Sequence, residues 1–214
     1  RMVENRRDSK MTNAVHISKM TGKLDGFRAI STNTITNKFC IKMNSAKAET
    51  ICKHCYSHTM LKSYRKNMAP ALQRNSDLLS SRPLEPTEVP VILDAVFRFD
   101  AHGELINEMH LYNLMTIAER NPHCTFSLWT KRKDIVQNCR VTRPVPANMI
   151  FIYSNPKIGK IMDAPPLGFH KTFNNVPEDQ DVDRQNCTGQ QCKNCLLCYR
   201  HDTTDTIVEK VKVY

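Results

Sequence analysis

The chain of 214 residues lacks long apolar stretches and any recognisable secretion signal. No run approaches the roughly 18 consecutive apolar residues that a membrane-spanning helix needs, which argues against an integral membrane protein. The segment from Arg1 to Arg7 is polar and has no apolar signal core, so we expect a cytoplasmic protein. The sequence contains nine cysteines, an odd number. Secreted proteins that are held together by disulfides usually have an even number. In a reducing compartment, closely spaced cysteines favour a metal site over disulfides.

Several motifs of common enzyme classes are absent as well. The sequence contains no G-x-G-x-x-G fingerprint, no phosphate-binding P-loop and no nucleophile elbow. These absences argue against a dinucleotide-binding dehydrogenase, a P-loop NTPase and an α/β-hydrolase. With 40% hydrophobic and 24% charged residues, the composition is that of an ordinary globular protein.

Acidic residues are in the minority. The chain carries 31 Lys and Arg against 21 Asp and Glu, a formal net charge of +10. Such a balance is compatible with binding to nucleic acid. The basic residues are nevertheless spread along the sequence, and no stretch interleaves them with aromatic residues as a single-strand binding groove does. A solvated basic surface is therefore an open alternative to a nucleic-acid partner.

What the sequence does contain is cysteine in two tight groups. The later group places Cys187, Cys192, Cys195 and Cys198 within twelve residues. The spacing C-x4-C-x2-C is one that iron–sulfur proteins use, and four thiolates suffice for a closed site with a structural or electron-transfer role. Zinc is the alternative, although zinc ribbons usually join two separated pairs of ligands. The compact spacing favours a [4Fe–4S] cluster over zinc.

The earlier group consists of Cys40, Cys52 and Cys55. Three thiolates can bind three irons of a [4Fe–4S] cluster and leave the fourth iron open to a substrate or cofactor. Two alternatives remain open at this point. In the first, His54 or His58 completes a zinc site. In the second, Cys40 is a buried thiol and only the other two cysteines are ligands.

The partition of the cysteines between two sites is not set by the sequence. Either Cys187 or Cys198 could close the earlier group and leave three cysteines behind. The remaining two, Cys124 and Cys139, are isolated, one at the start of a predicted strand and one near the end of a predicted helix. We expect both to pack in the core rather than to bind metal.

Apolar periodicity predicts an α/β fold. The strands of its central part are expected at 26–32, 96–99, 124–130 and 149–154. The helices between them are expected at 106–120 and 133–139. Strands and helices that alternate in this way form βαβ units and a parallel sheet.

Three parts of the chain are expected: a polar N-terminal arm over 1–25, an α/β core over 26–162, and a cysteine-rich segment with an edge strand over 163–214. A helix is predicted over 58–79, with an interruption at Pro70. The sequence also predicts loops over 40–55 and 163–186, and an extended edge strand from Thr206 onward.

Polar residues follow two of the predicted strands. Asp100 and Glu104 flank His102 in a turn after the strand at 96–99, where they could act as acid–base groups or contact a cofactor. The alternative is a polar loop between strand and helix, in which Asp100 or a neighbouring residue caps the next helix. Lys131 follows the strand at 124–130 and begins a run of three cations. That run suits an anion, although a solvated loop is an equal alternative.

Four stretches of the chain resemble the phage gene product 88 family of cysteine-rich proteins. They are Cys40 with Cys52-Lys-His-Cys55-Tyr56, Arg98-Phe-Asp-Ala-His-Gly103-Glu104-Leu105, Asn121-Pro122 to Trp129-Thr130-Lys131-Arg132, and Cys192-Lys-Asn-Cys195-Leu-Leu-Cys198-Tyr199. That family is in turn similar to shortened radical S-adenosylmethionine enzymes.

The resemblance implies a partial, truncated β/α barrel with a parallel sheet and a C-terminal metal-binding segment. In such a fold a [4Fe–4S] cluster is held after the first strand, here by Cys40, Cys52 and Cys55. S-adenosylmethionine would bind at the carboxyl ends of the strands. The residues in the corresponding positions are Asp100, Gly103, Glu104 and Lys131.

The sequence thus supports one main hypothesis and one alternative. The first is a phage iron–sulfur protein in the host cytoplasm, with one or two [4Fe–4S] clusters and a redox or S-adenosylmethionine-dependent activity on an unknown substrate. The alternative is a non-enzymatic zinc-binding module that contacts nucleic acid or a host protein. Whether the chain is an enzyme at all is left open by the sequence.

Overall fold

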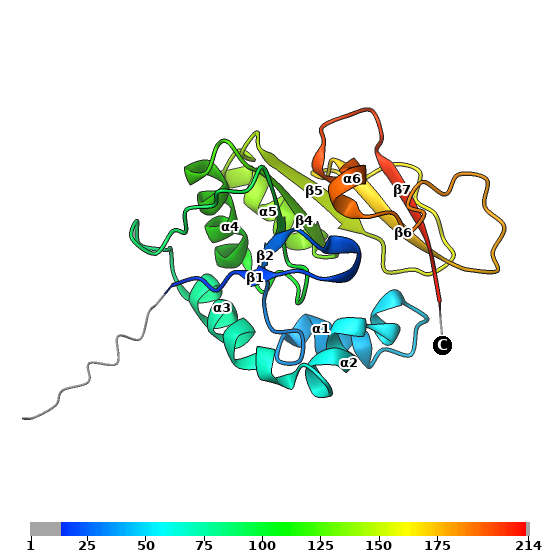
Figure 1. The fold of residues 1–214 in the computed structure, drawn as a ribbon, viewed down its shortest axis with the longest axis horizontal. Helices are drawn as coiled ribbons and strands as arrows, with labels where there is room; N and C mark the ends of the chain where they lie inside the picture. The colour runs from blue at the N-terminus through cyan, green and yellow to red at the C-terminus, as the bar shows by residue number, and fades with distance from the viewer. Residues whose placement is uncertain (1–13, 213–214) are drawn as a thin grey trace, which may run out of the picture.

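The fold is seen in a computed structural model that describes residues 14–212 (Figure 1). In this part of the chain seven strands form one sheet in the order β1-β2-β3-β4-β5-β6-β7. The strands are β1 (Ser18–Lys19), β2 (Arg28–Ile30), β3 (Val96–Phe99), β4 (Thr125–Thr130), β5 (Met149–Ser154), β6 (Lys171–Pro177) and β7 (Thr206–Val211). β1 pairs with β2 in the antiparallel sense, and every later pairing is parallel. The predicted mixed α/β class with a mostly parallel sheet is therefore confirmed.

Helices connect the strands in the first two thirds of the chain. The α-helices are α1 (Lys38–Asn44), α2 (Tyr56–Lys62), α3 (Ala69–Ser81), α4 (Glu108–Arg120), α5 (Lys133–Thr142) and α6 (Cys192–Cys195). Short 3-10 helices are η1 (Gly22–Leu24), η2 (Ile51–His54), η3 (Lys66–Met68) and η4 (Leu197–Tyr199). Among residues 14–212, no helix has the length and apolar character needed to cross a membrane.

The strand order decides where the helices lie. Crossovers between parallel strands are almost always right-handed, and here every crossover advances in the same direction along the sheet. The helices that connect β2 to β5 are therefore expected on the same face, and Figure 1 shows α3, α4 and α5 gathered on one side of the sheet. Side chains from both layers, such as Phe97, Phe126, Leu114 and Val136, form the hydrophobic core between them.

The opposite face of the sheet is covered by the C-terminal segment. Alternate side chains of a strand point to opposite faces, so Arg98 and Trp129 point away from the core that holds Phe97 and Phe126. The hydroxyl of Ser127 on this face donates to the carbonyl oxygen of Cys198 over 2.8 Å. The second cysteine group, which lies in the connection between β6 and β7, is thereby fixed against the face opposite the core helices.

Most predicted elements lie where the periodicity placed them. Strands β3 and β5 match the predicted ranges, and β2 and β4 lie within theirs. The helix predicted at 106–120 is α4, which begins after Asn107 because the side chain of that residue accepts from the backbone N–H of His110. Asp100 does not cap this helix. β7 is the last strand of the sheet, as predicted, and its residue Glu209 also forms an isolated parallel bridge with Cys187.

Three local predictions were wrong. The range 40–55 is not a loop, because the side chain of Asn37 accepts from the backbone N–H groups of Phe39 and Cys40 and starts helix α1 there. The helix predicted over 58–79 is divided at Ser63 rather than at Pro70. Pro70 instead lies in the first turn of α3, where its missing N–H costs nothing.

The third wrong prediction is the loop over 163–186, which contains strand β6. This strand was overlooked because it is rich in buried polar residues. The amide of Asn174 is satisfied by neighbours on both sides, accepting from Asn155 and donating to the carbonyl oxygen of Ile207. The buried ammonium of Lys171 forms an ion pair with Asp202. Such partners come from distant segments, so they leave no local pattern.

The predicted N-terminal arm over 1–25 is described only in part. Residues 1–13 lie outside the described range. From residue 14 onward the chain joins the sheet, since Ser18 and Lys19 pair with Ala29 and Arg28 of β2.

Candidate functional site

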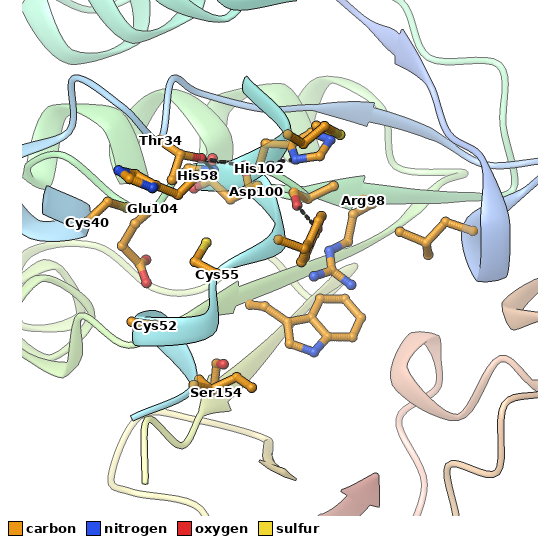
Figure 2. A pocket seen from close by; sticks show the side chains of 18 of the residues that line it. Thr34, Cys40, Cys52, Cys55, His58, Arg98, Asp100, His102, Glu104 and Ser154 are labelled. Carbon is orange, nitrogen blue, oxygen red and sulfur yellow. Dashed lines mark hydrogen bonds between the residues drawn. The ribbon is translucent and has the colours of Figure 1, made fainter. Parts of the chain in front are cut away.

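A cavity of about 600 Å³ lies at the carboxyl ends of the parallel strands. Its walls come from three places: the strand ends, the segment from α1 to α2, and the C-terminal cysteine-rich segment. A pocket at the carboxyl ends of parallel strands is where α/β enzymes build their active sites. In Figure 2, Cys40, Cys52 and Cys55 lie on one side of this pocket and Arg98 lies on the other.

The first cysteine group is positioned by two short helices and the loop between them. Cys40 lies in α1, Cys52 lies in η2, and Cys55 is the N-cap residue of α2. The side-chain amide of Asn44 at the end of α1 donates to the carbonyl oxygen of Cys52 over 2.8 Å, which links the two helices. All three thiols border the cavity.

The thiols of this group influence one another. Burial raises the pKa of Cys40, and nearby Glu104, Cys55 and Cys52 raise it further. Burial also raises the pKa of Cys52, an effect that Lys131 opposes and Cys55 reinforces. The three sulfur atoms thus share one local environment, together with a carboxylate and an ammonium from the strand ends.

The second cysteine group borders the same cavity from the other side. Cys187, Cys192 and Cys198 line it, whereas Cys195 faces a separate hollow of about 30 Å³ that all four cysteines surround. The chain turns sharply at Leu196, which has a left-handed backbone with φ of 54° and joins α6 to η4. The structure therefore brings both groups to one part of the molecule.

The arrangement of the thiols differs from that of a formed metal site. All nine cysteines are free thiols, including Cys124 and Cys139, which are buried in the core as predicted. Within residues 14–212, no three His, Cys, Asp or Glu side chains are placed so that they could hold a metal ion. The donor types suit iron–sulfur chemistry, but the thiols would have to move closer to a common centre to bind it.

The carboxylate of Glu104 joins the ends of β3 and β4. It accepts from the hydroxyl of Thr130, from the backbone N–H of Lys131 over 2.9 Å, and from the backbone N–H of Leu105 over 2.9 Å. The side chain is buried. Glu104 therefore fixes the turn after β3 against the end of β4, which is where Lys131 enters the cavity.

Replacing Glu104 with glutamine is expected to destabilise the fold by about 1–3 kcal/mol. The amide keeps the shape of the side chain, but its NH₂ group would face a backbone N–H or the hydroxyl of Thr130. Urea unfolding measures the loss, with exposed Glu85→Gln as the control that should change stability little. An equal effect of both substitutions would contradict the bridging role.

The turn after β3 has an unusual backbone. Asp100 has a positive φ of 49° and Gly103 has a φ of 87°. A Cβ atom on Gly103 would lie 2.2 Å from the hydroxyl oxygen of Thr32 and 2.7 Å from its carbonyl oxygen. Thr32 in turn donates to the carboxyl of Asp100 over 3.1 Å. Only a residue without a side chain fits here, so the turn and the end of β2 are closely packed.

Asp100, which borders the cavity, forms a buried pair with His110. The Nε2 atom of His110 lies 4.0 Å from Oδ2 of Asp100, and neither atom has a hydrogen-bond partner among the described residues. Burial raises the pKa of Asp100 well above its usual value, with Glu104 adding to the rise. Burial lowers the pKa of His110 to about 3. Burial therefore favours the uncharged form of both groups.

Replacing Asp100 with asparagine is expected to change how stability depends on pH. In the wild type, the raised pKa of Asp100 makes stability fall as pH rises above about 4, the usual value in an unfolded chain. The lowered pKa of His110 makes stability rise with pH from about 3 to about 6.5, so the two effects oppose each other. The asparagine variant keeps only the second effect.

Chemical unfolding at several pH values between about 4 and 6.5 tests this prediction. Relative to wild type, the stability of the Asp100→Asn variant should rise more steeply with pH, by up to about 1.4 kcal/mol per pH unit. Exposed Asp77→Asn is the control and should leave the slope unchanged. A wild-type slope in the Asp100 variant would show that this carboxyl is ionised in the folded protein.

A second polar network lies between the turn and α2. The Nδ1 atom of His102 is 3.0 Å from the hydroxyl of Ser57, which lies 2.6 Å from that of Thr34. The hydroxyl of Tyr56 donates to the carbonyl oxygen of Ala101 over 2.6 Å. Burial lowers the pKa of His102 to about 4, so the imidazole is neutral. These contacts attach the Cys55 end of α2 to the turn after β3.

The predicted site residues therefore lie together. Asp100, Gly103, Glu104 and Lys131 border the same cavity as the first cysteine group. Sequence reasoning missed Ser154, whose hydroxyl accepts from the ammonium of Lys131 over 2.9 Å. Ser154 is the polar last residue of a buried strand, a signal similar to the one that marked Lys131 just after β4. Ser57, in contrast, carried no signal, because its role depends on a contact with a distant turn.

Comparison with known proteins gives one match. A family model described as gene product 88 matches residues 3–186. No curated protein matches the chain, and neither does any solved structure.

Proposed function

We propose that this chain, which belongs to the gene product 88 family, is an iron–sulfur protein with a substrate cavity beside its cluster. One observation carries the proposal: Cys40, Cys52 and Cys55 border the same cavity as the polar residues at the strand ends. In this proposal the three cysteines bind a [4Fe–4S] cluster and leave one iron without a protein ligand. The protein then acts in the host cytoplasm of the phage that encodes it.

The number and the sequence spacing of the cysteines support a cluster over a zinc ion. Three thiolates can bind three irons of a [4Fe–4S] cluster and leave the fourth iron open, and the C-x4-C-x2-C spacing of the second group is one that iron–sulfur proteins use. Zinc ribbons instead join two separated pairs of ligands. Within residues 14–212, no three metal-binding side chains are grouped around one centre, so the thiols would have to move together to bind either metal.

The second cysteine group is proposed to hold a second, closed cluster. Its four thiols surround a common hollow and leave no obvious position for a substrate. The hydrogen bond from Ser127 to Cys198 attaches this group to β4. A closed cluster here would stabilise the C-terminal segment or carry electrons to the first one.

The residues at the strand ends have separate proposed tasks. Glu104 fixes the turn after β3, and Gly103 lets this turn approach Thr32 closely. Lys131 places an ammonium at the end of β4, where Ser154 orients it. Together with Asp100, these residues would bind the polar end of S-adenosylmethionine. When bound, a [4Fe–4S] cluster supplies one electron at a time and can contact such a ligand through its open iron.

The sheet supports the finer proposal of a radical-enzyme-like, partial barrel. Strands β2 to β7 follow one another in order and in parallel, and the helices of the core lie on one face. A sheet that is wound in one direction leaves its other face free to enclose a pocket, as in β/α barrels. The cavity borders this face through Arg98 and Trp129.

Calorimetry tests the cofactor part of this proposal. Protein that has been reconstituted with iron and sulfide without oxygen should bind S-adenosylmethionine, whereas metal-free protein should bind it at least tenfold more weakly (roughly 1.4 kcal/mol or more). If the protein binds iron but not S-adenosylmethionine, the cofactor part of the proposal is wrong and an electron-transfer role is favoured.

The alternative function, a zinc-holding module for nucleic acid, has one observation in its favour. Tyr64 is 76% exposed and lies among Lys62, Arg65 and Lys66 at the margin of the cavity. Exposed aromatic rings beside cations can stack with bases and contact phosphates. Salt-dependent binding of short RNA or DNA, lost in Tyr64→Ala and accompanied by bound zinc, would favour this function.

A further inference from the structure

Arg98 is an unusual side chain for the wall of a cavity. It lies in β3 and its guanidinium lies flat against the ring of Trp129, with 3.2 Å between the Cζ atom and the ring centroid. Its Nε atom is buried and has no hydrogen-bond partner among residues 14–212. The guanidinium also borders the cavity opposite the first cysteine group (Figure 2).

The charge of Arg98 is not balanced by an acidic residue. In the described part of the chain, no Asp or Glu forms an ion pair with it, although other arginines such as Arg28, Arg82 and Arg143 each have one. A guanidinium that is partly buried without an anion loses hydration and gains no ion pair in return. Stacking on an aromatic ring offsets only part of this cost.

The surroundings of Arg98 point to a ligand rather than to a structural role. Lys131 is another of the five Lys and Arg residues that line the cavity, and its ammonium bonds only to the hydroxyl of Ser154 among the described residues. Aromatic side chains of Trp129, Phe173 and Tyr199 line the same wall. A volume of about 600 Å³ is that of a small-molecule pocket. The cavity thus combines Arg98 and Lys131 with an apolar wall.

We infer that Arg98 binds the oxyanion of a small organic substrate, a carboxylate or a phosphate, whose apolar part lies along the wall formed by Trp129 and Phe173. The planar guanidinium can donate two parallel N–H bonds to either group. This inference rests on the proposed function, in which the cavity is the substrate site. It assigns to the substrate a negative charge and a body that is at least partly apolar.

One competing explanation concerns the second cysteine group. Burial raises the pKa of the Cys198 thiol, and the positive charge of Arg98 acts against this rise. Arg98 could therefore serve as the counterion of metal-bound thiolates instead of binding a substrate. The two explanations make different predictions for the metal-bound protein. If Arg98 is paired with metal-bound thiolates, it should not bind a further anion once metal is present.

Trp129 provides a direct signal, because it is the only tryptophan in the sequence. We would titrate metal-free and reconstituted protein with benzoate, phenyl phosphate and benzamide while following tryptophan fluorescence. Benzamide matches benzoate in shape but carries no charge. Both anions should give a saturable change in fluorescence. Benzamide should bind at least about tenfold more weakly than benzoate, because it cannot form a charge-assisted hydrogen bond with the guanidinium. The tighter of the two anions identifies the substrate as a carboxylate or a phosphate.

Variants complete the experiment. Arg98→Met should abolish anion binding, Arg98→Lys should retain part of it, and exposed Arg120→Met should bind as wild type does. Thermal melting shows whether each variant folds. If Arg98→Met does not fold, anion binding by Arg98→Lys is compared with that of the wild type instead. Equal binding of benzoate and benzamide, or unchanged binding in Arg98→Lys and Arg98→Met, would overturn the inference. Binding to metal-free protein alone would also overturn it in favour of the counterion. Anion binding by a protein that takes up no iron would instead contradict the proposed function.

Discussion

Replacing Cys52 with serine is expected to remove about four iron atoms per chain, together with the same amount of sulfide. Cys52 borders the same cavity as Cys40 and Cys55, and a serine hydroxyl is a poor ligand for iron in such a cluster. The second cysteine group should keep its own iron, because its thiols surround a separate hollow. Iron and acid-labile sulfide, measured after reconstitution without oxygen, give the result.

The matched control for this substitution is Cys139→Ala. Cys139 is also a free thiol, but it is buried in the core on α5, away from the cavity. Its replacement should leave the iron content unchanged and cost only a small loss of stability. If Cys52→Ser retained all of its iron while Cys139→Ala lost some, the assignment of the first cysteine group as the ligands would be wrong.

Replacing Gly103 with alanine is expected to destabilise the protein by about 3 kcal/mol or more. The positive φ of 87° disfavours any side chain, and the new Cβ atom would overlap with the backbone oxygen of Thr32 at 2.7 Å. Thr32 cannot withdraw easily, because it continues β2 and donates to Asp100. Denaturant unfolding should show the loss, with a Tm lower by roughly 6–12 °C.

Gly22→Ala separates the two causes of this effect. Gly22 has a similar φ of 67°, but nothing lies within 4 Å of the position that a Cβ atom would occupy. Its replacement should therefore cost only the backbone contribution, about 1 kcal/mol. Similar losses for Gly22→Ala and Gly103→Ala would mean that the close approach to Thr32 is absent, and with it the tight turn that forms the floor of the cavity.

The sequence predicted the central strands well because each has a buried apolar face that recurs locally. Phe97 and Phe99 alternate with Arg98, and β5 is apolar along most of its length. β6 could not be found in this way. Its buried Asn174 and Lys171 are stable only because Asn155 and Asp202 come from other parts of the chain. Polar pairs of this kind depend on tertiary structure and carry no periodic signal.

For the candidate site, the sequence indicated which residues matter but not how they are arranged. Two cysteine groups were evident from their spacing, yet their position on one cavity depends on the contact of Ser127 with Cys198. Asp100 was predicted either to be functional or to cap a helix. Its buried partner His110 lies ten residues away, across the turn and the start of α4, and only the fold brings the two together.

The metal content of the protein tests the central proposal most directly. The measurement is iron, acid-labile sulfide and zinc per chain, in protein purified and reconstituted without oxygen. We expect iron and sulfide in equal amounts, about four or about eight of each, depending on whether one or both cysteine groups hold a [4Fe–4S] cluster. A colourless protein that contains zinc and takes up no iron would contradict the proposal.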